Sequence, residues 1–308
     1  MGDARLRTLA ENISESYRVQ DGIIKLEAKN QINKLAVIQI IETLQRLIFP
    51  GYFGETRLLA HSAEDYAEEL LIQILPSLKE QIVYALRNKA PDADVETAAE
   101  WCSYEFLESL PHIRDLLRTD VEASFDGDPA AFSKDEIILS YPGIYAIMVN
   151  RLAHELYRID VPLIPRMMTE YAHDRTGIDI HPGAVIGHHF FMDHGTGIVI
   201  GETTVIGNYV KIYQGVTLGA MSTRGGQMLH GVKRHPTIED HVTIYSGASI
   251  LGGNTVIGEG VVIGSNAFIV KSVPENTRVS VKNPELQFKA SEQHPVELNQ
   301  YEFWDFVI

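Results

Sequence analysis

Cysteine is almost absent from this chain: among 308 residues there is a single one, Cys102. One thiol cannot form an intrachain disulfide, and chains without disulfides are typical of reducing compartments. Cys102 follows Trp101 within an apolar pattern of helical spacing. We therefore expect a buried thiol with a structural role.

Long apolar runs and an excess of positive charge are also missing. No run approaches the ~20 apolar residues that span a bilayer, and the polar N-terminus lacks the apolar region of a signal peptide. We expect a cytoplasmic protein. Because 41 acidic residues outnumber 26 basic ones, the formal net charge is −15. This charge disfavours nucleic acids and anionic membranes as partners, since both require basic surfaces.

What is present is a six-residue repeat between Gly177 and Val273. Apolar residues recur at this interval in four series: Ile180, Ile186, Met192, Ile198; Ile200, Ile206, Ile212, Leu218; Ile238, Ile244, Ile250; Ile257, Ile263, Ile269. A fixed period of six is typical of a β-helix, in which each triangular coil covers its neighbour. A sandwich of short strands would instead show a period of two with turns every 8–12 residues.

Residues 1–170 show apolar positions at helical spacing, which predicts an α-helical domain used for packing and assembly. Pro76 lies within the second apolar face and is expected to kink or break its helix. Ser133 and Glu136 have the spacing of a capping box. The predicted fold class is therefore α+β, with helices first and the β-helix over residues 171–275.

Two segments depart from the repeat. A glycine-containing loop over residues 219–236 interrupts it, and loops extruded from a repeat scaffold often carry binding functions. Residues 276–308 are expected to form an extended tail that ends in Phe303, Trp304, Phe306 and Ile308. These apolar side chains either cover the protein's own surface or enter a partner's pocket.

The strongest chemical cluster surrounds His194. Asp193 precedes it directly, and Asp179 lies fifteen positions earlier, close to one full coil of about eighteen residues. We expect stacked coils to bring Asp179 near His194. A histidine held by a carboxylate is the arrangement of a general base, because the carboxylate fixes the tautomer and favours the cation. The alternative is a structural histidine satisfied by a neighbour.

Other polar residues suggest an amino-acid site. Arg234, followed by His235, closes the long loop, and a guanidinium can grip a carboxylate at two points. Asp128 and Asp193 can accept hydrogen bonds from an ammonium group. The alternatives are a solvated loop arginine, a turn-forming aspartate and a residue at the coil edge. A general base, an arginine for a carboxylate and aspartates for an ammonium group together indicate a site for an amino acid that bears a hydroxyl.

Histidines are frequent around the coil, which raises the possibility of zinc. Adjacent His188 and His189, however, point to opposite sides of an extended segment. We expect no metal site. A phosphate-binding loop of the Gly-x4-Gly-Lys type is also missing from the sequence.

Four motifs resemble those of the serine O-acetyltransferases, a family of hexapeptide-repeat acyltransferases with a left-handed parallel β-helix: Asp179-Ile-His-Pro182, Asp193-His194-Gly-Thr-Gly-Ile-Val-Ile-Gly-Glu202, Gln214-Gly-Val-Thr-Leu-Gly219 and Lys233-Arg-His-Pro236. The resemblance implies direct acetyl transfer from the co-substrate acetyl-CoA to L-serine, giving O-acetyl-L-serine and CoA. This reaction is the first step of cysteine biosynthesis from serine.

The resemblance also implies roles for individual residues. His194 would be the base and Asp179 its orienting partner. Asp128, Asp193, Arg234 and His235 match positions that bind serine, or L-cysteine as feedback inhibitor. The helical domain would thus supply part of the serine site. The matching positions for CoA, in a groove between coils of a trimer, are Gly219, Ala220, Ser246 and Ser265. Lys271 is added as a phosphate contact; its alternative is a solvated lysine.

The same resemblance implies a homotrimer or a dimer of trimers, and leaves the choice open. The C-terminal Ile308 resembles the residue through which the family tail binds O-acetylserine sulfhydrylase. The loop after Leu218 is longer than the family's usual loop. Three alternatives remain: another hexapeptide acyltransferase with a different hydroxyl acceptor, a metal-dependent β-helix enzyme of the carbonic-anhydrase type, and a non-catalytic binding subunit that uses the tail.

Overall fold

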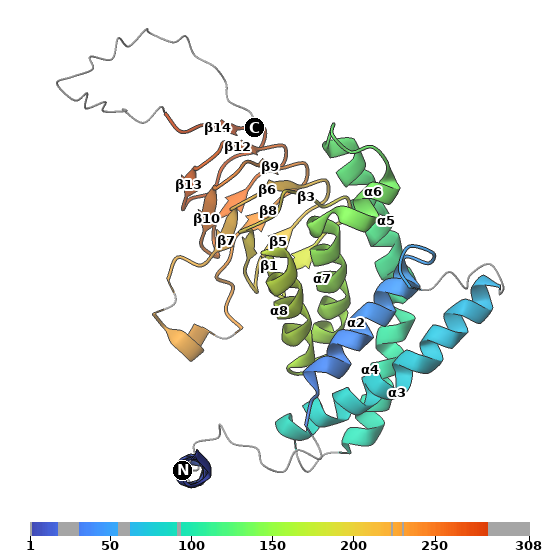
Figure 1. Ribbon diagram of the computed structural model, residues 1–308. Helices are drawn as coiled ribbons and strands as arrows, with labels where there is room; N and C mark the ends of the chain where they lie inside the picture. The colour runs from blue at the N-terminus through green and yellow to red at the C-terminus, as the bar shows by residue number, and fades with distance from the viewer. Residues whose placement is uncertain are drawn as a thin grey trace, which may run out of the picture.

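A computed structural model describes residues 2–17, 31–54, 62–90, 94–222, 224–229 and 231–282. Helices come first and a coil of short strands follows (Figure 1). The helices are α1 (Gly2–Ser16), α2 (Lys34–Ile48), α3 (Ala63–Lys89), α4 (Val95–Glu108), α5 (Leu110–Gly127), α6 (Lys134–Ser140), α7 (Pro142–Arg158) and α8 (Ile164–Thr176). The boundary expected at residue 170 falls within α8.

Side-chain caps determine where several helices begin. Asn33 accepts hydrogen bonds from the amides of Leu35 and Ala36 at the start of α2, and Ser62 forms a capping box at the start of α3. Ser133 caps α6 as predicted, but the Glu136 carboxylate accepts its hydrogen bond from the amide of Phe132. The expected box is therefore only half formed. Pro76 does not end its helix, since α3 continues from Ala63 to Lys89.

The coil contains short parallel strands. They are β1 (Asp179–Ile180), β2 (Val185–Ile186), β3 (Phe191–Asp193), β4 (Val199–Ile200), β5 (Val205–Ile206), β6 (Lys211–Tyr213), β7 (Thr217–Gly219), β8 (Thr237–Ile238), β9 (Thr243–Ile244), β10 (Ser249–Leu251), β11 (Val256–Ile257), β12 (Val262–Ile263), β13 (Phe268–Ile269) and β14 (Arg278–Val279). They stack in three sheets: sheet A is β1-β4-β7-β10-β13, sheet B is β2-β5-β8-β11 and sheet C is β3-β6-β9-β12-β14. The β-helix predicted from the six-residue period is confirmed.

The repeated apolar residues fill the inside of the coil. Ile200, Ile212 and Ile244 are 0–1% exposed, whereas outward-facing Val199 is 37% exposed. The corners use left-handed backbone: His189, Tyr209 and His241 have φ values of +55°, +57° and +59°. Coil length varies, because Asp179 pairs with Val199, twenty residues later, and Val199 with Thr217, eighteen residues later. The first coil is therefore longer than the expected eighteen.

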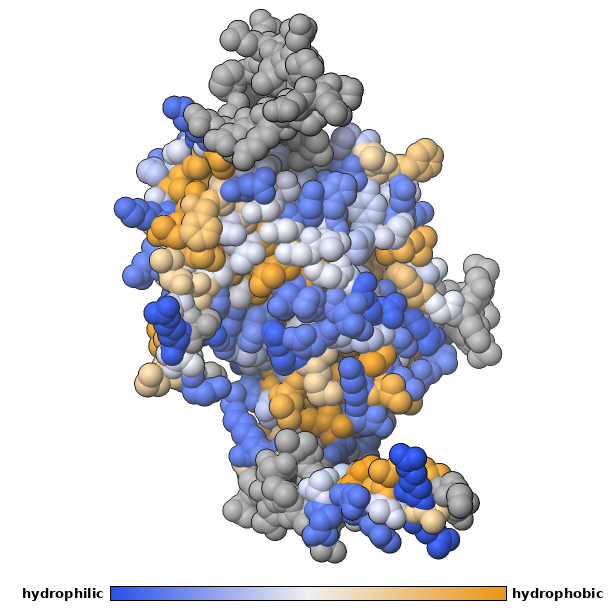
Figure 2. Space-filling view, turned by 60° about the vertical axis from the view of Figure 1, so that its left-hand side comes forward, coloured by the Kyte–Doolittle hydropathy of each residue, from blue (hydrophilic) through white to orange (hydrophobic). Residues whose placement is uncertain are grey.

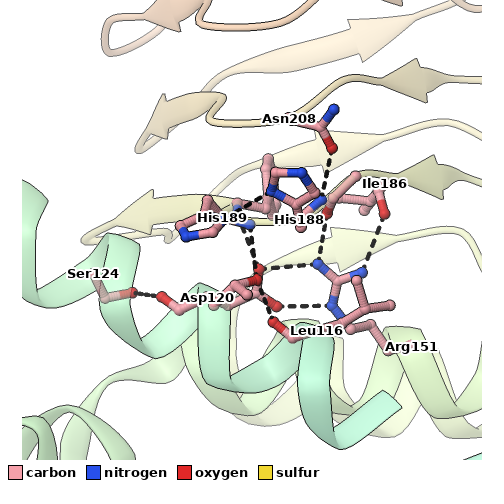
Figure 3. Close-up of polar contacts among 11 residues, drawn as sticks. Leu116, Asp120, Ser124, Arg151, Ile186, His188, His189 and Asn208 are labelled. Atoms are coloured by element: carbon pink, nitrogen blue, oxygen red, sulfur yellow. Dashed lines mark hydrogen bonds and ion pairs between the residues drawn. The ribbon is translucent and has the colours of Figure 1, made fainter. Parts of the chain in front are cut away.

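The helical domain packs on the first coil through α5, α7 and α8. An added Cβ at Gly127, in α5, would lie 2.7 Å from the Phe191 ring. At Gly143, in α7, it would lie 2.8 Å from the carbonyl oxygen of Met192. Glycine at these two positions allows both helices to contact β3 closely. A buried ion pair between Asp120 of α5 and Arg151 of α7 joins these two helices (Figure 3).

The long loop between β7 and β8 projects away from the coil (Figure 1) and contains a short 3-10 helix, η3 (Gly226–Leu229). Cys102 is buried, as predicted, and burial raises the pKa of its thiol. On the face shown in Figure 2, apolar patches are separated by hydrophilic bands. Among the described helices, none is both long enough and apolar enough to cross a membrane.

Candidate active site

A column of polar residues follows the corner where sheet C leads into sheet A. His194, Gln214, Ser246 and Ser265 each lie two positions after an inward-facing residue of β3, β6, β9 or β12, and these strands pair in register. The four residues therefore stack one coil above the next. Ser246 Oγ donates a hydrogen bond to Ser265 Oγ at 3.2 Å. The column begins beside the helical domain and runs toward β14.

His194 is the exposed end of this column. Its φ of +56° lies in the left-handed region, which is uncommon for residues other than glycine. The imidazole side chain is 67% exposed, and its Nδ1 lies 3.8 Å from Asp193 Oδ1. A reactant can thus reach the ring from solvent, with a carboxylate already beside it.

Asp128 reaches the same region from the end of α5. It accepts a hydrogen bond from the Tyr141 hydroxyl at 2.5 Å and another from the Ala130 amide at 2.8 Å. These bonds lower the pKa of the Asp128 carboxyl, and nearby His194 lowers it further. The bond to Asp128 also raises the pKa of Tyr141 to about 12, with a smaller contribution from Asp193. Asp128, Tyr141, Asp193 and His194 therefore share one electrostatic environment.

Gln214 adds an unsatisfied acceptor to this region. Its Oε1 is buried and has no hydrogen-bond partner among the described residues. Buried polar atoms in native proteins almost always have a partner.

Asp179 has a different neighbour from the one expected. Its Oδ1 lies 3.9 Å from Arg166 Nη1, and within the described residues no hydrogen bond or ion pair joins it to His194. Asp179, Glu170 and His173 also form a group whose ligand atoms lie within 4.8 Å of one another. Arg166 pairs with Glu170 as well, so one guanidinium contacts both carboxylates of this group.

Arg234 and His235 lie at another corner, where sheet A leads into sheet B. The Arg234 guanidinium forms an ion pair with Glu202, and its Nη1 donates to the carbonyl oxygen of Leu229 at 3.1 Å. Glu202 accepts a further hydrogen bond from the Tyr157 hydroxyl at 3.0 Å. Arg234 therefore ties the long loop to the coil and to α7.

His235 is buried, at 8% exposure. The amide of Thr203 donates to its Nδ1 at 3.0 Å, which leaves Nε2 as the protonated nitrogen. Burial, assisted by neighbouring Arg234, lowers the pKa of His235 to about 4. The imidazole is thus neutral at pH 7 and has an N–H to donate.

The remaining predicted residues border sheet A. Gly219 ends β7 beside Leu251, and Ala220 follows it at the root of the loop. Lys271 is exposed just beyond β13. Ile308 lies outside the described residues.

Sequence reasoning missed Tyr141, Glu202 and Gln214. Tyr141 belongs to none of the four motifs, and Glu202 and Gln214 appear only as letters of two of them. Their contacts to Asp128 and Arg234, and the position beside His194, arise from residues far apart in the chain. No spacing rule links Tyr141 to Asp128 or Glu202 to Arg234, whereas Gln214 lies one coil after His194 in the repeat.

No model of a known protein family matches the chain. The serine acetyltransferase, plasmid, of Synechococcus elongatus is 44% identical over 208 residues, covering 64% of this chain and 65% of that protein. The serine acetyltransferase of Bacillus subtilis is 48% identical over 122 residues, covering 40% and 54%. The matched segments thus span between half and two thirds of these curated relatives.

Solved structures match over more of the chain. Serine acetyltransferase 1 of Entamoeba histolytica, in complex with L-cysteine, is 39% identical with a TM-score of 0.70, covering 82% of this chain and 87% of that one. The Neisseria gonorrhoeae enzyme in complex with serine is 31% identical with a TM-score of 0.53, covering 79% and 95%. A serine acetyltransferase complex with CoA is 30% identical with a TM-score of 0.51, covering 78% and 95%. The chain belongs to the serine acetyltransferase family.

Proposed function

We propose that this protein transfers the acetyl group of acetyl-CoA to the hydroxyl of L-serine, and so supplies O-acetyl-L-serine for cysteine synthesis. The observation that carries the proposal is the cluster of Asp128, Asp193 and His194 at the head of the polar column. Family members with serine, L-cysteine or CoA bound support the choice of ligands.

His194 acts as the general base. Its imidazole takes the proton from the serine hydroxyl as the oxygen attacks the thioester carbonyl, which gives a tetrahedral intermediate. When the intermediate collapses, the C–S bond breaks and the proton returns from the imidazolium to the CoA sulfur. The open position of His194 favours this role, because both reactants must reach one ring nitrogen.

A carboxylate stabilises the imidazolium. We assign this orienting role to Asp179, which must exchange its 3.9 Å contact with Arg166 for one with His194 when substrates bind. Asp193 already lies 3.8 Å from the ring and shares the charge stabilisation.

Acidic and basic groups recognise the two ends of serine. Asp128 and Asp193 accept hydrogen bonds from the ammonium group, and the lowered pKa of Asp128 keeps it ionised at neutral pH. Arg234 binds the carboxylate of serine, and this carboxylate must share the guanidinium with Glu202. His235 donates its Nε2 proton to the same carboxylate. L-Cysteine has the same two charged ends, so we expect it to compete for this site.

A complete site requires a second copy of the chain. His194 and Arg234 lie at different corners of the β-helix and in different coils, and a face about five residues wide by itself separates the two corners by roughly 16 Å. One serine cannot span that distance. We therefore infer a homotrimer, or a pair of trimers, in which His194 of one copy faces Arg234 of the next.

CoA follows the polar column away from His194. Ser246 and Ser265 offer hydroxyl groups at successive levels. Gly219 and Ala220 contribute backbone groups from the other side of sheet A, and Lys271 contacts a phosphate. We also assign Ile308 to capture of O-acetylserine sulfhydrylase, which a pull-down with and without this residue tests.

Release of CoA, measured with a thiol reagent over a panel of acceptors, tests the reaction. We expect release that requires both acetyl-CoA and L-serine. His194→Ala should lower turnover by about 10²- to 10⁴-fold, while calorimetry shows unchanged CoA binding. Equal release with a sugar acceptor would favour another acyltransferase, and an unchanged rate in the variant would reject His194 as the base.

A further inference from the structure

A buried ion pair between α5 and α7 lies outside the proposed substrate contacts. Asp120 is fully buried and Arg151 is 5% exposed. The guanidinium binds the carboxylate at two points, with Nε 2.7 Å from Oδ2 and Nη2 2.9 Å from Oδ1. Figure 3 shows the two side chains facing one another between the helices and the coil. A paired contact of this kind fixes direction as well as distance.

The pair also binds the corner between β2 and β3. Arg151 donates to the carbonyl oxygens of Ile186 at 3.1 Å and Gly187 at 2.7 Å. Asp120 Oδ1 accepts the amide of Phe190 at 2.9 Å. Thr119, the residue before Asp120 in α5, accepts a hydrogen bond at its Oγ1 from the amide of His189 at 3.0 Å. Two helices and one corner therefore meet at a single, internally satisfied junction.

Two chain segments, residues 120–128 and 190–194, carry the proposed serine-binding residues, and both start at this junction. From Asp120, α5 continues for eight residues to Asp128, a distance of about 12 Å along a helix. From Phe190, the chain enters β3 and reaches His194 four residues later, about 13 Å along a strand. The two segments contact each other again where Gly127 packs on the Phe191 ring. A rotation of α5 at the junction would move Asp128 relative to His194.

Stability alone is a poor reason for such a pair. Burial raises the pKa of Asp120, and the contacts with Arg151 and the Phe190 amide, with a smaller effect of His189, oppose this penalty. Apolar replacements of buried ion pairs are often neutral or stabilising. Apolar contacts would allow α5 to slide or rotate, whereas the two-point pair holds one geometry.

We propose that Asp120 and Arg151 are positioning residues that set the span between Asp128 and His194, and through it the affinity for the acceptor amino acid. The proposal rests on the proposed function, because it takes both residues to contact the same substrate. The CoA column lies farther along the coil and does not depend on the position of α5.

Steady-state kinetics with Arg151→Lys and Arg151→Met test the proposal. Misplacement by about 1 Å can cost up to about 100-fold, so we expect KM for L-serine to rise roughly 10-fold or more. KM for acetyl-CoA should stay within about twofold, and the lysine variant should recover part of the loss. Arg158→Met, which breaks exposed ion pairs on the same helix, is the matched control and should change neither constant.

Thr119→Val is a milder second variant that keeps the ion pair, and it should shift KM for L-serine in the same direction if Arg151→Met does not fold. A lower melting temperature with both KM values unchanged would reduce the pair to a structural role and overturn the proposal.

Amide hydrogen exchange needs no turnover, so it tests the positioning role of Asp120 and Arg151 separately from the proposed acetyl transfer to serine. The Arg151 variants should exchange faster at residues 128–131 and 191–194, with no change at 256–263, whether or not serine is the acceptor.

Discussion

At the scale of single residues, the site depends on neighbours that fix charge and orientation. Tyr141 and the Ala130 amide keep Asp128 ionised. Burial keeps His235 neutral, and its hydrogen bond with Thr203 selects the tautomer that donates from Nε2. None of these partners is close in sequence to the residue that it controls, except Ala130.

Tyr141→Phe tests the control of Asp128. Without the phenol hydroxyl, the largest cause that lowers the pKa of Asp128 is lost, so that pKa rises. We expect the acidic limb of the pH profile of KM for L-serine to move to higher pH, while the profile for acetyl-CoA does not change. Identical acidic limbs in the two proteins would show that Asp128 does not bind the ammonium group.

Two histidines with a lowered pKa predict a loss of stability in mild acid. The pKa values of His181 and His235 are lowered to about 4, chiefly by burial. Between about pH 6.5 and pH 4 the unfolded chain binds protons at these histidines and the folded chain does not, so folding stability falls as the pH falls. The loss is at most about 1.4 kcal/mol per pH unit for each group.

Urea unfolding at pH 7 and pH 5 measures this loss. His181→Asn should reduce the difference between the two pH values, and exposed His112→Asn serves as the control. An equal pH dependence in all three proteins would contradict the assignment.

At the scale of elements, α5 and α7 must approach β3 closely for Asp128 and Tyr141 to reach His194. The two glycines at these contacts differ in what an added methyl group would meet. At Gly143 it meets the backbone oxygen of Met192, and at Gly127 the ring of Phe191. A backbone atom of a paired strand cannot move aside as a ring can.

We expect Gly143→Ala to destabilise the protein by about 1–3 kcal/mol, the usual range for overpacking. Gly127→Ala should cost less, because rotation of Phe191 can relieve part of the contact. Thermal and urea unfolding of the two variants give the comparison. The reverse order would mean that the α7 contact is the more adaptable one.

At the scale of the whole molecule, the coil places the two halves of the proposed site at different corners. His194 follows sheet C, and Arg234 precedes sheet B. The long loop projects from the corner that carries Arg234 (Figure 1). A closed ring of copies is the arrangement that brings unlike corners together repeatedly.

Co-expression of His194→Ala with Arg234→Ala tests the shared site. Each variant alone should have strongly lowered activity. If one site takes His194 from one copy and Arg234 from the next, random mixing restores about a quarter of the sites, because each needs one copy of each kind. Mixing the purified variants without exchange of subunits is the control. No recovery in the co-expressed protein would place both residues in one copy.

The inward-facing positions of the coil and the burial of Cys102 followed from the sequence. A six-residue period determines which side chains face inward in every coil, and the motifs around Asp193 and Arg234 indicated the family. These properties are local or strictly repetitive, so spacing alone is sufficient to predict them. The local rule was only half successful at the start of α6, where the Glu136 carboxylate accepts its hydrogen bond from the amide of Phe132.

Only the tertiary structure decided how the candidate site is assembled. It showed a first coil of twenty residues, Asp179 beside Arg166, Glu202 on Arg234 and the junction between Asp120 and Arg151. The last three pair residues that no period relates: Asp179 and Arg166 join the coil to α8, Glu202 and Arg234 join the coil to the long loop, and Asp120 and Arg151 join α5 to α7. Such contacts depend on how the helical domain lies against the first coil, and that orientation is set by packing and buried charge together.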